Sequence, residues 1–204
     1  IGRDTTTVAV YQKNLLRHLS VIPLGSDNVT KDIASSLSIE ESEAESLKLK
    51  YGSAYTELTE ETEDENYTLK DGRLVSRKLL CDIVEARMEE ILVNVSDQIT
   101  ASGIKDTLIA GAVLTGGGAN IKDIDKAFTV YTGIEKLKVA KNVNFAVNSK
   151  IADVKVKDGT HNAILGLLAL GDENCAGTDI KEEDSSLFVD EELETKKTTE
   201  TVST

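Results

Sequence analysis

The chain has 204 residues, of which 40% are hydrophobic and 4% aromatic, and it contains no Trp. This length accommodates a real core in one large domain or two small subdomains, and the shortage of aromatic side chains argues against a carbohydrate cleft or an aromatic platform for nucleic acid. The 36 acidic and 23 basic residues give a formal net charge of -13. Because such a balance repels phosphate backbones, we expect no nucleic-acid partner.

The negative charge is concentrated at one end of the chain. Residues 172–204 hold 11 acidic residues and three lysines, whereas residues 1–171 carry a net charge of only -5. The segment 172–204 also has few apolar residues, so we expect a disordered acidic linker there. No apolar run approaches the roughly 18 residues of a membrane span, and two cysteines with two distant histidines make no metal site. Because the chain opens at Ile1 directly in a strand pattern, we expect it to be a piece of a longer protein.

The first part of the chain predicts a hairpin and two helices. Residues 5–11 are β-branched or aromatic except for Ala9, and a second apolar run at 15–24 follows a short polar turn, which is typical of paired strands. Apolar residues at helical spacing predict a helix over 29–37. Ser38 and Glu41 have the spacing of a capping box, which predicts that a second helix begins there.

The middle of the chain begins with the clearest turn signal in the sequence. Asp71-Gly72 between two short β-rich stretches predicts a tight hairpin, and Ser76 then caps the longest helix. Apolar residues recur on one side of that helix at Leu80, Ile83, Val84, Met88, Ile91, Leu92, Val95 and Ile99.

After the long helix the pattern alternates between strands and helices. We expect a buried strand over 108–114, a helix over 121–131, a short strand over 137–140 and a last helix over 161–170.

Two glycine-containing segments are candidates for binding phosphate or nucleotide. Gly116-Gly117-Gly118 lies between a predicted strand and a helix, where amides unobstructed by Cβ atoms can approach a nucleotide. A tight turn that simply needs glycine is the alternative. At the start of the first strand, Gly2 and the hydroxyls of Thr5 and Thr6 can face phosphates, although threonine is also an ordinary strand former.

Taken together and in this order, these motifs resemble the second half of an actin-like ATPase and are most similar to the FtsA family. The residues that carry the resemblance are 7–11, 21–25, 29–34, 43–52, 85–91, 113–120 and 162–166, so it covers almost all of residues 1–171. It implies an α/β fold, namely an actin-like ATPase (ribonuclease H-like) lobe with a mixed sheet, flanking helices and a smaller α+β subdomain. The implied subdomains are 1–54 with 145–171, and 55–144. A rod-shape or pilus-assembly relative, or a sugar or acetate kinase lobe, remains the alternative.

The resemblance also implies ATP and Mg2+ in a cleft between two lobes. By position, Gly2, Arg3, Thr5 and Thr6 belong to a phosphate loop, in which Arg3 and Asp4 occupy positions that are often glycine. Gly116, Gly117, Gly118 and Asn120 line the adenosine side, and Glu85 and Arg87 approach the ribose and base. No catalytic residue is implied, and the whole protein is at most a slow ATPase. Because the chain supplies only one side of the cleft, we expect it to bind ATP weakly by itself.

The partners implied by the family are the C-terminal peptide of FtsZ, docked on residues 55–144, and further copies that form a filament. Lysines that could meet the peptide are Lys122, Lys126, Lys136, Lys138 and Lys141, unless they form an ordinary solvated face. The family reaches the cytoplasmic face of the inner membrane at the division site through a C-terminal amphipathic helix. We expect no such helix in this chain.

Overall fold

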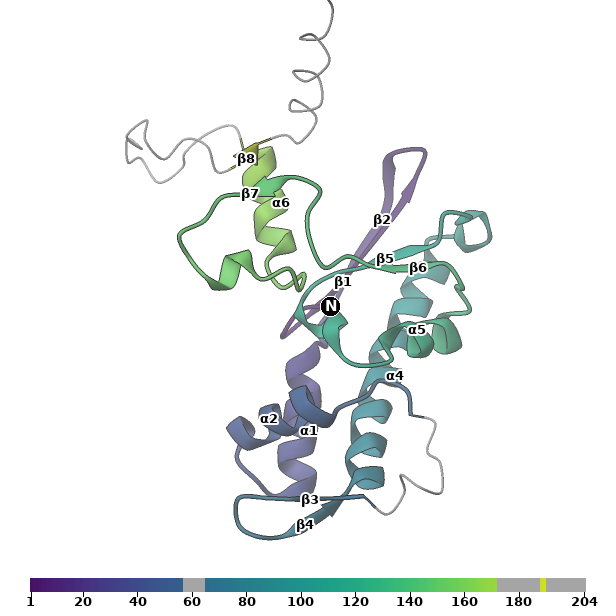
Figure 1. The fold of residues 1–204 in the computed structure, drawn as a ribbon. Coiled ribbons are helices and arrows are strands. Elements are labelled where there is room, and N and C mark those ends of the chain that lie inside the picture. Colours follow the sequence, from purple (N-terminus) through teal and green to yellow (C-terminus); the bar gives the residue numbers. More distant parts are fainter. Residues whose placement is uncertain (57–64, 172–187, 190–204) are drawn as a thin grey trace, which may run out of the picture. The chain divides into compact units, whose positions relative to one another are not determined.

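The computed structural model describes residues 1–56, 65–171 and 188–189. The chain forms two compact units, Ile1–Val139 and Ala140–Thr204, which are described separately. Figure 1 labels their helices and strands. The predicted subdomain limits, 1–54 with 145–171 and 55–144, stay a prediction.

The first unit opens with the predicted hairpin. Strand β1 (Thr6–Gln12) pairs antiparallel with β2 (Leu15–Ile22), starting from Thr6 opposite Ile22. Lys13 and Asn14 both have positive φ, which is the geometry of a type I′ turn and matches the twist of paired strands. Every second side chain of β1 from Thr6 to Val10 is buried, and both strands contact helix α4 (Arg77–Ala101). The hairpin is confirmed.

Two helices follow, and the predicted capping box is wrong. Helix α1 (Ser26–Leu37) ends at Ser38, which adopts the left-handed conformation (φ 51°) and donates its own N–H to carbonyls of the last turn of α1. Helix α2 (Glu41–Tyr51) begins after Glu40, with no side-chain cap. Ser38 is the residue that ends α1, and Glu40 is the residue that precedes α2. The Ser38 hydroxyl therefore does not cap α2.

A second hairpin leads into the longest helix. Strands β3 (Asn66–Thr68) and β4 (Leu74–Ser76) pair antiparallel around the predicted Asp71-Gly72 turn. Helix α4 (Arg77–Ala101) starts at Ser76, whose hydroxyl oxygen accepts a hydrogen bond from the Leu79 N–H at 3.2 Å. Both predictions are confirmed.

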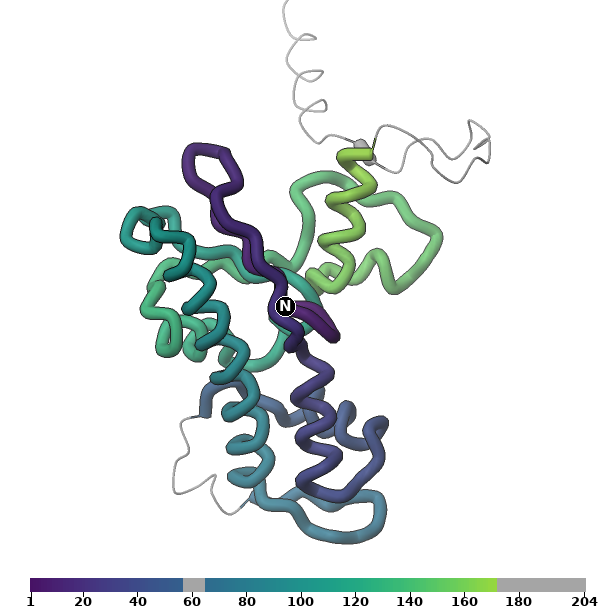
Figure 2. The backbone as a smooth tube through the Cα atoms, turned by 180° about the vertical axis from the view of Figure 1, so that it is seen from behind, coloured from purple at the N-terminus to yellow at the C-terminus, as the bar shows by residue number. Residues whose placement is uncertain are grey.

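Helix α4 organises the core of the first unit. Its 25 residues extend over about 38 Å, and Figure 2 shows its first half beside α1. It also contacts α2, α5 and both strands of the first hairpin. The buried side chains of this helix are Leu80, Cys81, Val84, Met88, Ile91, Leu92, Val95 and Ile99.

The strands and helices after α4 are shorter than predicted. A 3-10 turn, η1 (Lys105–Thr107), precedes β5 (Ala112–Leu114), which pairs parallel with β6 (Leu137–Val139). Gly111 has a φ of +86°, which ends the strand on its N-terminal side. A second 3-10 turn, η2 (Gly117–Asn120), delays the next helix, so that α5 (Ile124–Thr132) begins three residues later than expected.

The described residues of the second unit form an α-helix, a 3-10 turn and short extended segments. Strand β7 (Ala146–Val147) pairs antiparallel with β8 (Phe188–Val189), and η3 (Asp153–Lys155) leads toward helix α6 (Asn162–Leu170), which was predicted. The expected linker over 172–204 lies outside the described residues, apart from β8. Among the helices of the described part, none combines the length and the apolar character that crossing a membrane requires.

Candidate functional site

The two glycine-containing segments predicted to bind nucleotide lie side by side in the first unit. The Ile1 amino group donates to the Thr115 carbonyl at 2.7 Å, and the Gly118 N–H donates to the Ile1 carbonyl at 3.1 Å. Gly116 has a φ of +96°, and a Cβ there would lie 2.4 Å from the Ile1 carbonyl oxygen. Gly116 is therefore needed for close backbone packing, and this packing brings the two segments together.

The N-terminal loop also contacts the start of α1. The Ser26 N–H donates to the Gly2 carbonyl at 3.0 Å, and the Asp27 N–H donates to the Arg3 carbonyl at 2.8 Å. The first amides of α1 are thus used within the protein and are not open to a ligand. A Cβ at Gly25 would lie 2.2 Å from the Arg3 carbonyl oxygen, so this glycine allows the loop to pass close to the helix.

The predicted ligands in the loop have different surroundings. Thr6 is buried, and its hydroxyl donates to the Leu24 carbonyl at 2.9 Å, so it ties β1 to the segment before α1. Arg3, Asp4 and Thr5 are exposed, and within the described residues their three backbone N–H groups have no protein acceptor. Amides without a protein acceptor can donate to an anion, so the loop is suited to phosphate at Arg3–Thr5 rather than at Thr6.

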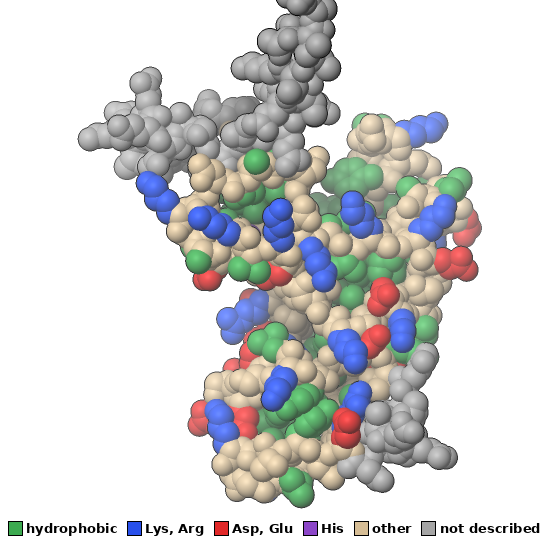
Figure 3. All heavy atoms as spheres, viewed as in Figure 1, with side chains coloured by type: hydrophobic (Ala, Val, Ile, Leu, Met, Phe, Trp, Pro, Cys, Tyr) green, Lys and Arg blue, Asp and Glu red, His purple; other side chains and the backbone are tan. Residues whose placement is uncertain are grey.

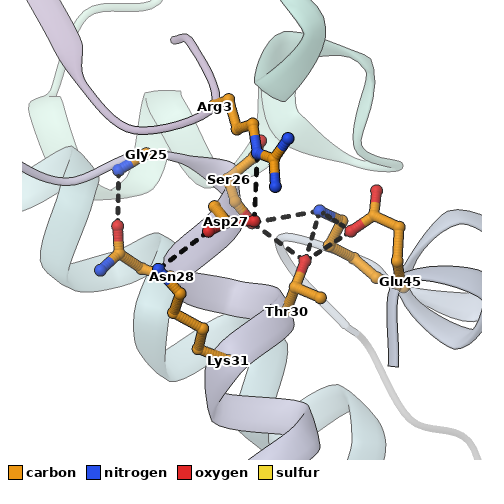
Figure 4. Close-up of polar contacts among 9 residues, drawn as sticks. Arg3, Gly25, Ser26, Asp27, Asn28, Thr30, Lys31 and Glu45 are labelled. Atoms are coloured by element: carbon orange, nitrogen blue, oxygen red, sulfur yellow. Dashed lines mark hydrogen bonds and ion pairs between the residues drawn. The ribbon is translucent and has the colours of Figure 1, made fainter. Parts of the chain in front are cut away.

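A cavity of about 380 Å³ opens beside this loop, between α1 and α2. It is lined by Arg3, Ser26, Asp27, Thr30, Glu41, Ser42, Glu45 and Lys48. Lys48 is only 8% exposed, and its Nζ lies 3.1 Å from the Ser26 carbonyl, 2.8 Å from the Thr30 hydroxyl and 2.6 Å from Glu45 Oε2. Figure 4 shows these three partners, Ser26, Thr30 and Glu45. A buried ammonium requires such partners, because an unpaired charge is costly in a protein interior.

No motif in the sequence points to this cavity. Its lining residues lie on two helices, Ser26, Asp27 and Thr30 on α1 and Glu41, Ser42, Glu45 and Lys48 on α2. Polar residues at helical spacing on two consecutive predicted helices could have indicated a polar cavity between them. Only the packing of α1 against α2 brings the two sets together.

Two cations share one carboxylate at the opening of the cavity. Lys31 Nζ lies 2.9 Å from Asp27 Oδ2, and Arg3 Nε lies 3.4 Å from Asp27 Oδ1. The hydrogen bond from Lys31, together with the charges of Lys31 and Arg3, lowers the pKa of Asp27 below its ordinary value. Asp27 is therefore ionised at neutral pH, and Lys31 is its nearer partner.

Glu85 and Arg87 make contacts away from this cavity. Arg87 forms a two-pronged ion pair with Asp32 of α1, at 2.5 and 3.0 Å, and also contacts Glu90. Glu85 accepts hydrogen bonds from the Thr56 N–H at 3.2 Å and from the Tyr131 hydroxyl at 3.4 Å.

Tyr131, on α5, is a partly buried neighbour of Glu85. Burial, and then the charges of Glu89 and Glu85, raise the pKa of the Tyr131 hydroxyl to about 12. Neither Glu85 nor Arg87 lines the cavity, and the nucleotide role assigned to them from the sequence stays a prediction.

The Arg87–Asp32 pair predicts a structural effect that can be measured. Replacing Arg87 by Gln should lower the free energy of unfolding by about 1–2 kcal/mol, because the paired, half-buried carboxylate of Asp32 loses its partner. Asp32→Asn should lower the free energy of unfolding by a similar amount. The double variant should lower it by clearly less than the sum of the two single losses. Urea titrations measure these losses, with the exposed Arg17→Gln as the control. Additive losses would contradict the link between α4 and α1.

The structure is similar to proteins of the actin-like ATPase fold. MreB5 of Spiroplasma citri bound to AMPPNP matches with a TM-score of 0.58 and 18% identity over 83% of this chain and 50% of that one. A chain of the PilM–PilN type IV pilus biogenesis complex matches with a TM-score of 0.58 and 18% identity over 85% of this chain and 45% of that one. At such identities the likeness concerns the fold alone, and it confirms the predicted α/β, actin-like class.

The sequence identifies the family within that class. The family model for the cell division protein FtsA matches residues 1–163. FtsA of Pseudomonas aeruginosa is 32% identical over 174 residues, which are 84% of this chain and 40% of that protein. FtsA of Bacillus subtilis is 41% identical over 124 residues, which are 58% of this chain and 28% of that protein. The chain belongs to the FtsA family of cell-division proteins, and it spans less than half the length of these relatives.

Proposed function

We propose that this chain is the nucleotide-binding half of an FtsA-type adaptor, which binds ATP, polymerises and tethers FtsZ filaments to the inner membrane during septum formation. The observation that carries the nucleotide part is the cavity between α1 and α2, which opens beside three exposed residues whose amides have no acceptor among the described residues. Its volume of about 380 Å³ lies within the usual range of small-molecule sites.

The residues at the cavity fit different parts of ATP. The amides of Arg3, Asp4 and Thr5 suit the phosphates, which are acceptors only. The carboxylate of Glu45 is 41% exposed and can accept hydrogen bonds from ribose hydroxyls. Gly117 is exposed in η2 and leaves room for the adenosine beside the loop. A bound Mg2+ would offset phosphate charge, and Asp4, an exposed carboxylate without an ion pair in the described part of the chain, is suited to face it.

Amide NMR titrations of the 204-residue chain with Mg·ATP, up to millimolar concentrations, test this assignment. We expect the amide signals of residues 3–5 and of the cavity walls to shift, even though binding is weak. Lys48→Met should reduce the affinity at least about tenfold, because Glu45 and Thr30 lose the ammonium that holds them in place. The matched control is Lys50→Met, an exposed lysine on the same helix. Unshifted cavity signals at millimolar ATP would refute the proposal.

The partner part of the proposal places the FtsZ C-terminal peptide on residues 55–144. Of the lysines named above, Lys126 lies 3.5 Å from Asp123, and Lys136 Nζ donates to the Ile109 carbonyl at 3.2 Å, so both already have protein partners. Figure 3 shows positive and negative side chains interspersed around α1, α2 and α4 on the visible face. Titrating the peptide against Lys122→Glu and Lys138→Glu tests whether lysines contribute. An unchanged affinity in both would favour an ordinary solvated face.

Filament formation, slow ATP hydrolysis and attachment to the cytoplasmic face of the inner membrane at the division site are proposed for the whole protein. The support is membership of the FtsA family. Attachment is assigned to an amphipathic helix of the whole protein, and the 204-residue chain is expected not to bind vesicles by itself. Cosedimentation of the 204-residue chain with anionic liposomes would contradict this assignment.

A further inference from the structure

Arg3 is the loosely held cation of the cavity between α1 and α2. The other lining cation, Lys48, is 8% exposed and contacts three oxygen atoms. The side chain of Arg3 is 77% exposed, and the one polar contact it makes with the described part of the chain is from Nε to Asp27 at 3.4 Å. Within the described residues its two Nη groups have no protein acceptor, so most of its donors are free for another acceptor.

Asp27 does not depend on Arg3 for its charge balance. Its other oxygen lies 2.9 Å from Lys31, four residues later on α1. If Arg3 moves away, Asp27 keeps an ion pair within its own helix. Releasing Arg3 therefore costs little, because an exposed pair of this kind contributes little to stability.

The remaining charges of the cavity make Arg3 important for an anionic ligand. Asp27, Glu41 and Glu45 line the cavity, and the ammonium of Lys48 is already paired with Glu45. Like charges at these distances oppose the binding of a phosphate. Arg3 is also the first residue of the segment with open amides, so its guanidinium and those amides can act on the same group.

We propose that Arg3 leaves Asp27 when a phosphorylated nucleotide enters the cavity and then binds a phosphate, so that this exchange makes the site select nucleotides over nucleosides. The inference rests on the proposed nucleotide function and adds the residue that determines phosphate selectivity. In the free protein Asp27 competes with the ligand for Arg3, so the two side chains have opposite effects on affinity.

The test depends on the opposite changes in ATP affinity that we expect from substitutions at Arg3 and Asp27. Arg3→Ala should weaken the binding of ATP about tenfold and leave the binding of adenosine unchanged. Asp27→Asn should strengthen the binding of ATP about threefold, because Arg3 is no longer held. In the Arg3→Ala background, Asp27→Asn should give a much smaller gain. Arg17→Ala, which removes an equal charge from an exposed position on β2, should change neither ligand's affinity.

The affinities are measured by amide NMR titration of the 204-residue chain with ATP, ADP and adenosine, and thermal melting checks that each variant is folded. If the wild type binds ATP but Arg3→Ala binds it equally well, the inference is wrong and the nucleotide function stands. If Asp27→Asn gives the same gain with and without Arg3, simple repulsion by Asp27 explains the data and the exchange is refuted. If the wild type binds neither ATP nor adenosine, the proposed function fails, and the inference fails with it.

Discussion

Replacing Gly116 by Ala should lower the free energy of unfolding by about 3 kcal/mol. About 1–2 kcal/mol of this comes from placing a side chain at a φ of +96°, a conformation that L-residues rarely adopt. The rest comes from the close contact with Ile1, whose carbonyl oxygen would lie 2.4 Å from the new Cβ. That oxygen accepts the hydrogen bond from Gly118, so moving it also disturbs the turn that holds the two glycine segments together.

Gly72 offers a matched control for this prediction. It has a φ of +87°, but a Cβ there would meet nothing within 4 Å. Gly72→Ala should therefore cost only the conformational part, about 1 kcal/mol. Urea denaturation followed by circular dichroism measures both losses, and the amide signals of residues 2–5 should move only in Gly116→Ala. Equal losses in the two variants would show that the packing of Ile1 against Gly116 contributes nothing.

Replacing Phe128 by Ala should cost about 3–5 kcal/mol, the largest loss we expect for a single side chain here. Phe128 is 1% exposed and lies on α5, which packs against α4. Its removal leaves a cavity in a close-packed core, and the surrounding side chains recover only part of the lost contact.

Val130→Ala is the matched control on the same helix. Val130 is 57% exposed, so its truncation should cost less than about 0.5 kcal/mol. Urea denaturation of both variants and the wild type gives the comparison. A loss below about 1.5 kcal/mol for Phe128→Ala would mean that α5 is not part of the cooperative core of the first unit.

Sequence patterns predicted the elements well where the signal is local. The turn-forming pairs Lys13-Asn14 and Asp71-Gly72 mark the two hairpin turns, and Ser76 marks the start of α4. The boundaries were wrong at two turns. Ser38 closes α1 instead of opening α2, and Gly111 turns the chain beside Lys136 before β5 begins.

The candidate site was predicted in part. The segments at Gly2 and Gly116 adjoin, as their joint assignment to one nucleotide required, but Thr6 is buried in a structural contact. Glu85 and Arg87 lie on the long helix, as expected, and bond to neighbouring elements rather than lining the cavity.

The amino-acid sequence alone determined the order of elements, the two glycine segments and the resemblance to the FtsA family, because periodicity, turn residues and motifs depend on neighbours along the chain. Only the tertiary structure revealed the cavity with its buried Lys48, and Arg3 beside an Asp27 that already has Lys31. The physical reason is that Arg3, Asp27 and Lys48 are far apart in the sequence. Burial and charge pairing arise only when α1, α2 and the N-terminal loop pack together, and no local pattern encodes that packing.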